Sequence, residues 1–275
     1  MMVDVAGLGG LTGKGKAVAI NVMAALGAVK LPGRVNEFVT HRRGHLKILD
    51  LFFYDQMDQA AASRWRRARA RQVKTLSKTL ALEGFDTRLL GRLLRCAPVS
   101  FPVQAAVEIL DGRLIKFKLY FSNVLNETPA MLAVIRRVVR ILEKPMPRLD
   151  VWSEADGIDC IGVDLLPGGG VEWKLYPLFV GATSLAAFEP IARETFKRYG
   201  VSDSGLTRFL ALARRYPAQA FGFLYRIEGD GVSGVKCWYR LATPVKDRQT
   251  GLKLSYLTCG NGVIERYLRE WEPLC

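Results

Sequence analysis

The stretch Arg113-Leu-Ile-Lys-Phe-Lys-Leu-Tyr-Phe121 alternates polar and apolar side chains with a period of two residues. Successive side chains of a β-strand point to opposite faces, so Lys116, Lys118 and Tyr120 share one face and the apolar residues share the other. The turn Asp111-Gly112 comes directly before this stretch, and a turn of this composition joins two antiparallel strands. We therefore expect the second strand of a hairpin, with one basic and aromatic face.

Two later stretches repeat the pattern, each after a glycine-containing turn. They are Val171-Glu-Trp-Lys-Leu-Tyr176 and Val235-Lys-Cys-Trp-Tyr-Arg240, and the lysines at positions 118, 174 and 236 are spaced by 56 and 62 residues. The recurrence indicates a structural repeat. The polar faces of these two strands carry Glu172, Lys174 and Tyr176, and Lys236, Trp238 and Arg240.

A simpler explanation exists for each strand taken singly. An antiparallel sheet with one face in water alternates apolar and polar residues in the same way. A solvated face varies freely, however, and seldom repeats tyrosine and tryptophan beside lysine. Three recurrences therefore favour a function for the polar faces.

Helix-like segments alternate with the paired strands along the chain. We expect strand pairs at residues 35–40 and 45–54, 103–110 and 113–121, 158–166 and 171–179, and 221–228 and 235–241. We expect helices up to residue 29, at 56–94 with a break near Gly84, and at 129–142, 185–199 and 206–215. A last strand near residues 252–258 and a terminal helix complete the pattern. No linker or low-complexity segment divides the chain, so we expect one domain over residues 1–275, with residues 1–33 as a lead-in and first helix.

This order predicts an α+β fold. The helices must bury their apolar faces, and the apolar faces of the strands suit them. The basic and aromatic faces then point away from the helices. If the sheet closes on itself, these faces line the lumen of an antiparallel barrel of about ten strands inside a ring of helices.

A lumen lined by Lys, Arg, Tyr and Trp suits a particular chemistry. Several converging cations need a bound anion to balance them, and a diphosphate fits three or four such donors. Aromatic faces stabilise a nearby cation. An allylic diphosphate that ionises becomes a diphosphate and a carbocation, so the pattern favours prenyl transfer.

The amino-acid composition argues against several classes of protein. The chain has 275 residues, 49% hydrophobic and 24% charged, with 40 Lys and Arg against 26 Asp and Glu and a net charge of +14. Its longest apolar stretch, at residues 17–29, is too short to cross a bilayer, so we expect no membrane segment. Five widely spaced cysteines without a CxxC pair argue against disulfides, and two histidines leave little material for a metal site. We expect a cytoplasmic protein.

The repeated helix-strand-strand-helix unit resembles the ABBA prenyltransferases, also called prenyltransferase (PT) barrels. Residues 162–176, Gly-Val-Asp-Leu-Leu-Pro-Gly-Gly-Gly-Val-Glu-Trp-Lys-Leu-Tyr, look like the G-x-D-x-x-P and R-x-K-x-Y motifs of the dimethylallyltryptophan synthase branch. Lys118-Leu-Tyr120 looks like its K-x-Y partner strand. Glu172 stands where that branch has arginine. In compactness and segment order the chain is most similar to the cyanobactin peptide prenyltransferases.

The resemblance implies roles for individual residues. Glu37 matches the acidic residue of the first strand that takes the proton from the acceptor or orients it. The implied diphosphate-binding cations are Lys47, Lys116, Lys118, Lys174, Lys236 and Arg240. The implied carbocation shield consists of Tyr120, Tyr176, Trp238 and Tyr256.

The resemblance also implies the partners of the reaction. The donor is dimethylallyl or geranyl diphosphate, and the acceptor is a nucleophilic or aromatic side chain of a ribosomal peptide or, alternatively, a small indole or phenol. No cofactor is tightly bound, no protein residues form a metal site, and Mg²⁺ is an optional companion of the diphosphate. We expect a monomer.

The main rival class is a nucleic-acid-binding protein. Arg64, Arg67, Arg71, Lys74 and Lys78 share one face of the predicted helix at 56–94, which is either a solvated face or a site for a polyanion. No helix-turn-helix, zinc-finger or RNP signature accompanies it, so we regard nucleic acid as an unlikely partner. Residues 10–16 fit G-x-x-x-x-G-K, but Ala17 replaces the Ser or Thr of a P-loop. Asp159 and Asp164 are interpreted as turn and strand residues.

Overall fold

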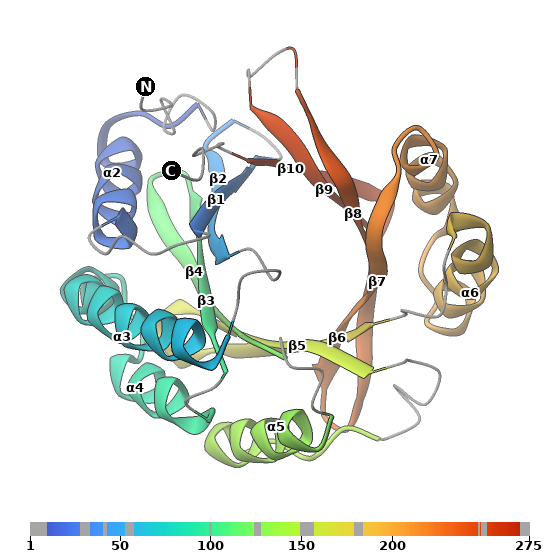
Figure 1. Ribbon diagram of the computed structural model, residues 1–275. Coiled ribbons are helices and arrows are strands. Elements are labelled where there is room, and N and C mark those ends of the chain that lie inside the picture. Colours follow the sequence, from blue (N-terminus) through green and yellow to red (C-terminus); the bar gives the residue numbers. More distant parts are fainter. Residues whose placement is uncertain are drawn as a thin grey trace.

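The structure is a computed structural model. It describes residues 10–27, 34–40, 43–52, 58–98, 101–123, 128–148, 157–178, 184–246, 248 and 252–269. Within them ten antiparallel strands form one closed barrel in the order β1-β10-β9-β8-β7-β6-β5-β4-β3-β2, and helices surround it (Figure 1). The predicted fold class is therefore confirmed.

The strands follow one another as five hairpins. They are β1 (Arg34–Val39), β2 (His45–Phe52), β3 (Val103–Leu110), β4 (Arg113–Ser122), β5 (Gly157–Leu165), β6 (Val171–Leu178), β7 (Ala218–Glu228), β8 (Gly231–Lys246), β9 (Lys253–Gly260) and β10 (Val263–Arg269). The α-helices are α2 (Gly13–Gly27), α3 (Gln59–Leu82), α4 (Thr87–Cys96), α5 (Thr128–Leu142), α6 (Leu185–Arg198) and α7 (Asp203–Ala213).

The terminal helix that the sequence predicted is wrong, because residues 263–269 form the closing strand β10. It pairs with β9 on one side and with β1 on the other. The turn between β9 and β10 is Asn261-Gly262, and both residues have positive φ, 50° and 75°. An Asn-Gly pair adopts this conformation at little cost and joins two strands with the natural twist. The last hairpin is therefore complete, and the helix–hairpin repeat ends without a helix in the described part of the chain.

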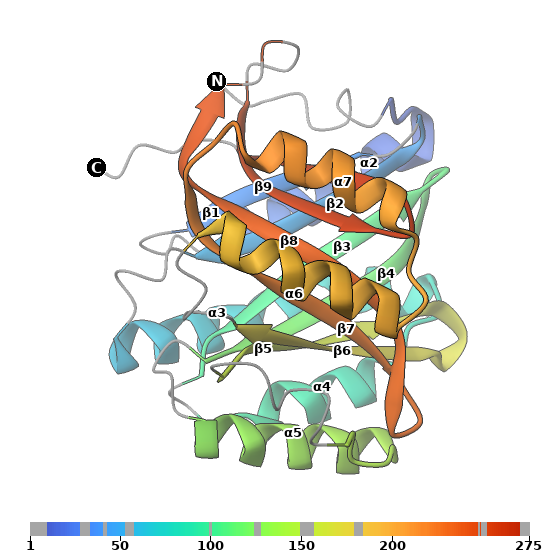
Figure 2. The ribbon, with the colours of Figure 1, turned by 90° about the vertical axis from the view of Figure 1, so that its right-hand side faces the viewer.

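The apolar faces of the strands point outward, toward the helices. Phe117, Leu119 and Phe121 of β4 are fully buried there, and so are the matching residues Trp173 and Leu175 of β6. Helices α2 to α5 pack along one side of the barrel, and α6 and α7 lie on the opposite side (Figures 1 and 2). The main hydrophobic core is thus a shell between barrel and helices. The inner face carries the polar residues together with a small buried cluster of Val39, Leu49, Ala106 and Tyr267.

One buried ion pair fastens α3 to this shell. Arg69 Nη1 lies 2.8 Å from Asp50 Oδ2 of β2, and neither side chain is exposed. The same guanidinium donates to the carbonyl oxygen of Val103 and to Gln72 Oε1. These hydrogen bonds compensate for the cost of burying the two charges, and the ion pair fixes the position of α3 against the barrel.

Helix α3 begins at Gln59, three residues after the predicted start at residue 56. Asp58 caps its N-terminus by accepting a hydrogen bond from the backbone N–H of Ala61 at 2.6 Å. The break near Gly84 lies between α3 and α4, as predicted. Among the described helices, none is long and apolar enough to cross a membrane.

Candidate active site

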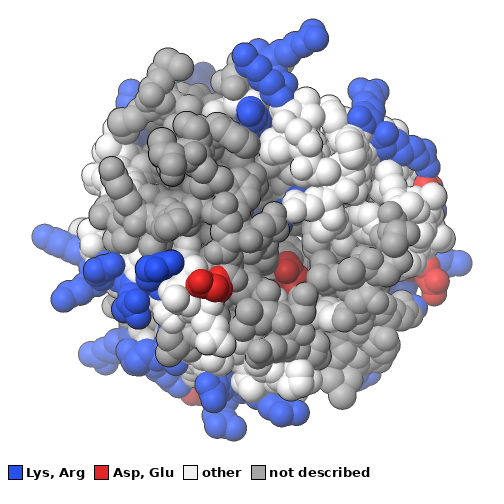
Figure 3. All heavy atoms as spheres, viewed as in Figure 1, with Lys and Arg blue, Asp and Glu red and all other residues white. Residues whose placement is uncertain are grey.

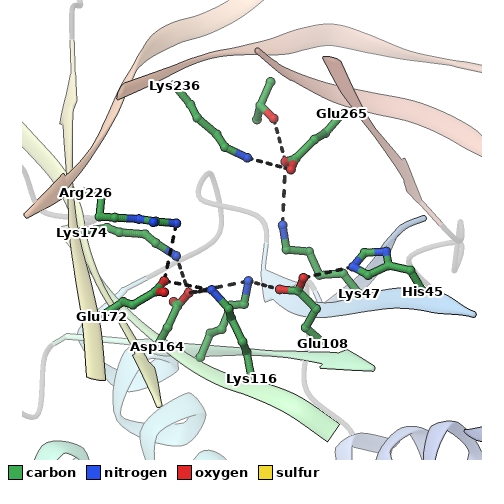
Figure 4. Close-up of polar contacts among 12 residues, drawn as sticks. His45, Lys47, Glu108, Lys116, Asp164, Glu172, Lys174, Arg226, Lys236 and Glu265 are labelled. Atoms are coloured by element: carbon green, nitrogen blue, oxygen red, sulfur yellow. Dashed lines mark hydrogen bonds and ion pairs between the residues drawn. The ribbon is translucent and has the colours of Figure 1, made fainter. Parts of the chain in front are cut away.

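The first polar cluster of the lumen is centred on Asp164 of β5. Its Oδ2 bonds to Lys174 Nζ and lies 3.7 Å from Lys118 Nζ and 3.9 Å from Lys116 Nζ. The side chain is fully buried (Figure 4), and Oδ1 has no hydrogen-bond partner among the described residues. Asp164 was interpreted from sequence as a strand residue, and it does lie in β5. The sequence did not indicate its further role as the carboxylate on which three predicted lysines converge.

Strand register explains this convergence. Lys118 of β4 pairs with Asp164, and Asp164 pairs in turn with Glu172 of β6. Lys174 of β6 pairs with Arg226 of β7. Side chains that share a face on neighbouring strands lie close together, so the period-two pattern brings opposite charges into one belt around the lumen.

A second carboxylate, Glu108 of β3, joins this belt. Its Oε2 lies 2.6 Å from Lys118 Nζ, and its Oε1 lies 3.0 Å from Nε2 of His45. Burial raises the pKa of Glu108, but the hydrogen bond with His45 and the charge of Lys118 outweigh burial and lower the pKa below its usual range. Glu108 is therefore a charged anchor for Lys118.

The opposite side of the lumen holds a cluster around Glu265 of β10. This buried carboxylate accepts hydrogen bonds from Lys236 Nζ at 2.7 Å, from Thr258 Oγ1 at 2.8 Å and from the hydroxyl of Tyr267 at 2.8 Å. Lys47 Nζ lies 3.8 Å away. Figure 4 shows Lys236 and Lys47 approaching Glu265 from different strands.

Burial and neighbouring charges act differently on the lysines. Burial, together with the nearby charge of Lys118, lowers the pKa of Lys47 to about 7. Burial also lowers the pKa of Lys174, against the attraction of Asp164. For Asp164 itself, the charges of Lys174 and Lys118 outweigh burial and bring the pKa to about 2. The Asp164 cluster is thus a set of charged groups in a largely buried site.

Aromatic rings form two groups beside these clusters. Tyr120 and Tyr176 meet edge to face with ring centroids 6.0 Å apart. On the other side, Tyr256 lies between Trp238, which stacks on it at 5.8 Å, and Tyr267, which meets it edge to face at 4.8 Å. All four predicted shield residues therefore take part in lumen aromatic contacts, and Tyr267 is a further member.

A glycine makes room for one of these groups. A Cβ atom on Gly162 of β5 would lie 3.2 Å from the ring of Tyr120 and 3.3 Å from the ring of Tyr176. Both distances are shorter than ordinary carbon contacts, so a side chain here would push the rings apart. The glycine of the G-x-D motif thus lets the two tyrosines meet across β5.

The structure brings most of the predicted site residues together. Lys47, Lys116, Lys118, Lys174 and Lys236 all contact the carboxylates or the tyrosine of the two clusters. Arg240 is half-buried on the same face of β8 as Lys236 and pairs in register with Tyr256. Glu37 lies in β1, in register with Leu49 and Arg269, and its side chain lies outside the described part of the structure.

One expectation about charge is corrected. The sequence argument supposed that only a bound anion could balance the converging cations, whereas carboxylates of neighbouring strands already do so. Glu172 illustrates the point, because its Oε2 lies 2.9 Å from Lys116 Nζ and 3.7 Å from Arg226 Nη2. The departure from arginine at this position thus adds a counter-ion, and a guanidinium comes from the next strand.

Sequence reasoning missed several lumen residues: Glu108, Arg226, Glu265 and Tyr267. Glu108 and Arg226 belong to the first strands of hairpins, which show the same alternation as the second strands but with fewer charges. Glu265 and Tyr267 were missed because residues 263–269 were predicted as helix. The signal that could have found them is the Asn261-Gly262 turn before an alternating stretch.

The lysines of the lumen leave hydrogen-bond donors for a bound anion. Within the described ranges no group of three or more His, Cys, Asp or Glu side chains could hold a metal ion. Each carboxylate of the lumen is bonded to one or more lysines instead. An ammonium group has three N–H donors, so a lysine held by one carboxylate keeps donors for another anion.

Comparison with solved structures identifies the architecture. The prenyltransferase PriB in complex with its product diphosphate is 17% identical, with a TM-score of 0.65, over 97% of this chain and 92% of that chain. The 5-dimethylallyltryptophan synthase from Streptomyces coelicolor is 12% identical, with a TM-score of 0.63, over 98% and 95%. The 6-dimethylallyltryptophan synthase from Micromonospora olivasterospora, in complex with DMASPP and Trp, is 13% identical, with a TM-score of 0.64, over 96% and 94%.

No protein-family model matches the chain, and no curated protein matches it. The likeness to solved structures establishes the fold: this chain has the ten-stranded PT barrel of those prenyltransferases.

Proposed function

We propose that this protein is a prenyltransferase that moves an allylic group from its diphosphate to an electron-rich acceptor inside the barrel. The observation that carries this proposal is the lumen itself, where buried lysines and stacked aromatic rings face one enclosed space. PriB, which has this barrel, was solved with L-tryptophan and dimethylallyl thiolodiphosphate. Two further proteins with this barrel are named dimethylallyltryptophan synthases.

The diphosphate is bound in this proposal by Lys47, Lys116, Lys118, Lys174, Lys236 and Arg240. Arg226 joins this set because it pairs in register with Lys174. The cations stabilise the charge that develops as the bond between the allylic carbon and the diphosphate oxygen breaks, with both electrons leaving on the oxygen. Because carboxylates already hold these lysines in place, the side chains need to move little during this step.

The allylic cation is then held among Tyr120, Tyr176, Trp238 and Tyr256. Ring faces attract a cation, and their bulk keeps out water that would convert it to an alcohol. An aromatic carbon or heteroatom of the acceptor attacks the cation and forms the new bond. Glu37 accepts the proton that the acceptor then loses.

Our first choice of acceptor is a side chain of a ribosomal peptide, as in the cyanobactin group, and the alternative is a small indole or phenol. The donor has five or ten carbons. We propose that one barrel domain carries out the reaction as a monomer in the cytoplasm, with Mg²⁺ accompanying the diphosphate where it is needed. The four described cysteines are free thiols, in keeping with that location.

The test is a calorimetric titration with dimethylallyl and geranyl thiolodiphosphates, which are unreactive donor mimics, beside a random oligonucleotide. We expect saturable micromolar binding of one mimic, and that mimic indicates the length of the donor. The variant Lys174→Ala should lose most of this affinity, while Lys78→Ala, on the exposed face of α3, should bind like the wild type. Tight, salt-dependent binding of the oligonucleotide with no response to either mimic would instead assign the protein to the nucleic-acid class.

The role of Glu37 has a test of its own. Glu37→Gln removes the base but keeps the shape of the side chain, so the variant should bind and ionise the donor but transfer it about 100-fold more slowly. The measurement is the ratio of prenylated acceptor to free prenyl alcohol, by chromatography. A product yield equal to that of the wild type would remove this role from Glu37.

A further inference from the structure

Lys47 differs from the other lysines of the lumen in its direct partner. Its Nζ donates a hydrogen bond to the hydroxyl of Tyr267 at 3.1 Å, and its closest carboxylate oxygen is Glu265 Oε2 at 3.8 Å. Lys116, Lys118, Lys174 and Lys236 each have a carboxylate oxygen within hydrogen-bonding distance. Lys47 is therefore the lumen lysine whose bonded partner is a neutral group.

The described neighbours of Lys47 come from several strands. The titratable groups that face it are Glu108 of β3, Lys118 of β4, Lys236 of β8, and Glu265 and Tyr267 of β10. On β1 its register partner is Val39, which is apolar. Only 8% of the residue is exposed.

These neighbours do not balance the charge of Lys47. Glu108 is bonded to Lys118 and His45, and Glu265 is bonded to Lys236, Thr258 and Tyr267. Each carboxylate is thus already hydrogen-bonded to other groups and is not bonded directly to Lys47. A buried amine without a bonded counter-ion favours its neutral form, which agrees with a pKa of about 7 for this group.

We propose that donor binding protonates Lys47: a diphosphate that enters the lumen supplies the missing counter-ion, and the amine takes up a proton from the solvent. The inference rests on the proposed function and adds to it the order of events. Lys118 and Lys236, with bonded carboxylates, attract the incoming anion, and Lys47 becomes a third ammonium group once the anion is present. The positive charge at the leaving group is thus completed only in the loaded enzyme.

A pH dependence of donor affinity follows by linkage. At pH 7 a group with a pKa of about 7 is half-protonated, so binding takes up about 0.5 proton per donor. As the pH rises from 7 to 8.5, the empty site loses protons that binding must restore, and affinity should fall about tenfold. Lys47→Arg should bind the donor with a much flatter pH dependence, because arginine stays charged in both states.

The experiment is a titration of the full chain with dimethylallyl and geranyl thiolodiphosphates in buffers of different ionisation enthalpy. The slope of apparent binding enthalpy against buffer enthalpy counts the protons taken up. Mimic protonation contributes equally to every variant, so the result is the difference between proteins. We expect wild type to take up about 0.5 proton more than Lys47→Arg at pH 7. Lys74→Met is the control, because Lys74 is exposed on the outer face of α3 and its replacement should leave the proton count unchanged.

The outcomes separate the two proposals. Saturable binding with a larger proton uptake in wild type and in Lys74→Met than in Lys47→Arg supports the inference. Saturable binding with the same proton uptake in all three proteins overturns the inference and leaves the proposed function standing. No binding of either mimic to a folded wild type overturns the proposed function and the inference with it.

Discussion

The lumen and the outer face formed by α3, α4 and α5 are both rich in cations, but they organise them in opposite ways. In the lumen, Lys118 and Lys174 are buried and bonded to carboxylates, and the partly exposed Lys236 is bonded to Glu265. On the outer helices, α3 carries seven Lys and Arg residues, α4 three and α5 three, and these helices contain no acidic residue. Figure 3 shows acidic side chains near the centre of the barrel end and basic ones gathered around its outline.

The outer cations fall into two kinds. Arg69 points inward to Asp50 and holds α3 in place. Arg64, Arg67, Arg71, Lys74 and Lys78 are exposed, and no ion pair with a described acidic residue is seen for them. Exposed charges are screened by salt within about 8–10 Å, whereas buried charges are screened far less. The burial of the lumen cations, and not the number of cations, therefore makes them suitable for binding a specific anion.

The largest loss of donor affinity is expected when Lys118 is replaced. The structure places its Nζ 2.6 Å from Glu108 and 3.7 Å from Asp164, at the meeting point of both carboxylates. Lys118→Ala should lower donor affinity about 100-fold, since charge-assisted contacts are the strong ones. Isothermal titration with the thiolodiphosphate mimic measures this. Lys74→Ala on the outer face is the control, and equal affinities for wild type and Lys118→Ala would remove Lys118 from the binding site.

A second prediction sharpens the comparison through acid stability. The pKa of Asp164 lies at about 2 in the folded chain against an ordinary 3.8, so its ion pairs contribute stability that is fully present above pH 3.8 and is lost as the pH falls toward 2. The contribution is about 2 kcal/mol. Urea unfolding between pH 6 and pH 2.5 should show a smaller acid-induced loss for Asp164→Asn than for wild type. Equal losses in both proteins would mean that Asp164 is not ion-paired in solution.

The smallest effect is expected on the outer face. Replacing Arg64, Arg67 and Arg71 by Gln should change donor affinity less than twofold, because exposed cations at this distance are screened. The same variant should weaken any salt-dependent binding of an oligonucleotide, measured by fluorescence anisotropy. A large loss of donor affinity in this variant would show that the outer cations contribute to the site, and that the two regions are not independent.

Sequence reasoning predicted the repeating part of the fold well. Period-two alternation and glycine turns placed four hairpins, and the charged face of each second strand was correctly assigned to the lumen. It failed at β10, where a short alternating stretch was interpreted as a helix. It also failed for Asp164, because a single acidic residue in an otherwise apolar strand carries no mark of its partners.

The features that can be read from the sequence are local: which residues alternate, where glycine permits a turn, and which faces of strands and helices are apolar. Those features depend on neighbours along the chain, and residues such as Lys116 and Lys118 display them directly. Which charged side chains lie in contact depends on the tertiary structure. Asp164 lies beside Lys174, and Lys47 beside Tyr267, because strand register and barrel closure bring together residues 10 and 220 positions apart. Charge balance in a lumen depends on those distances, and burial amplifies it, so the electrostatics of the site emerge only when the barrel closes.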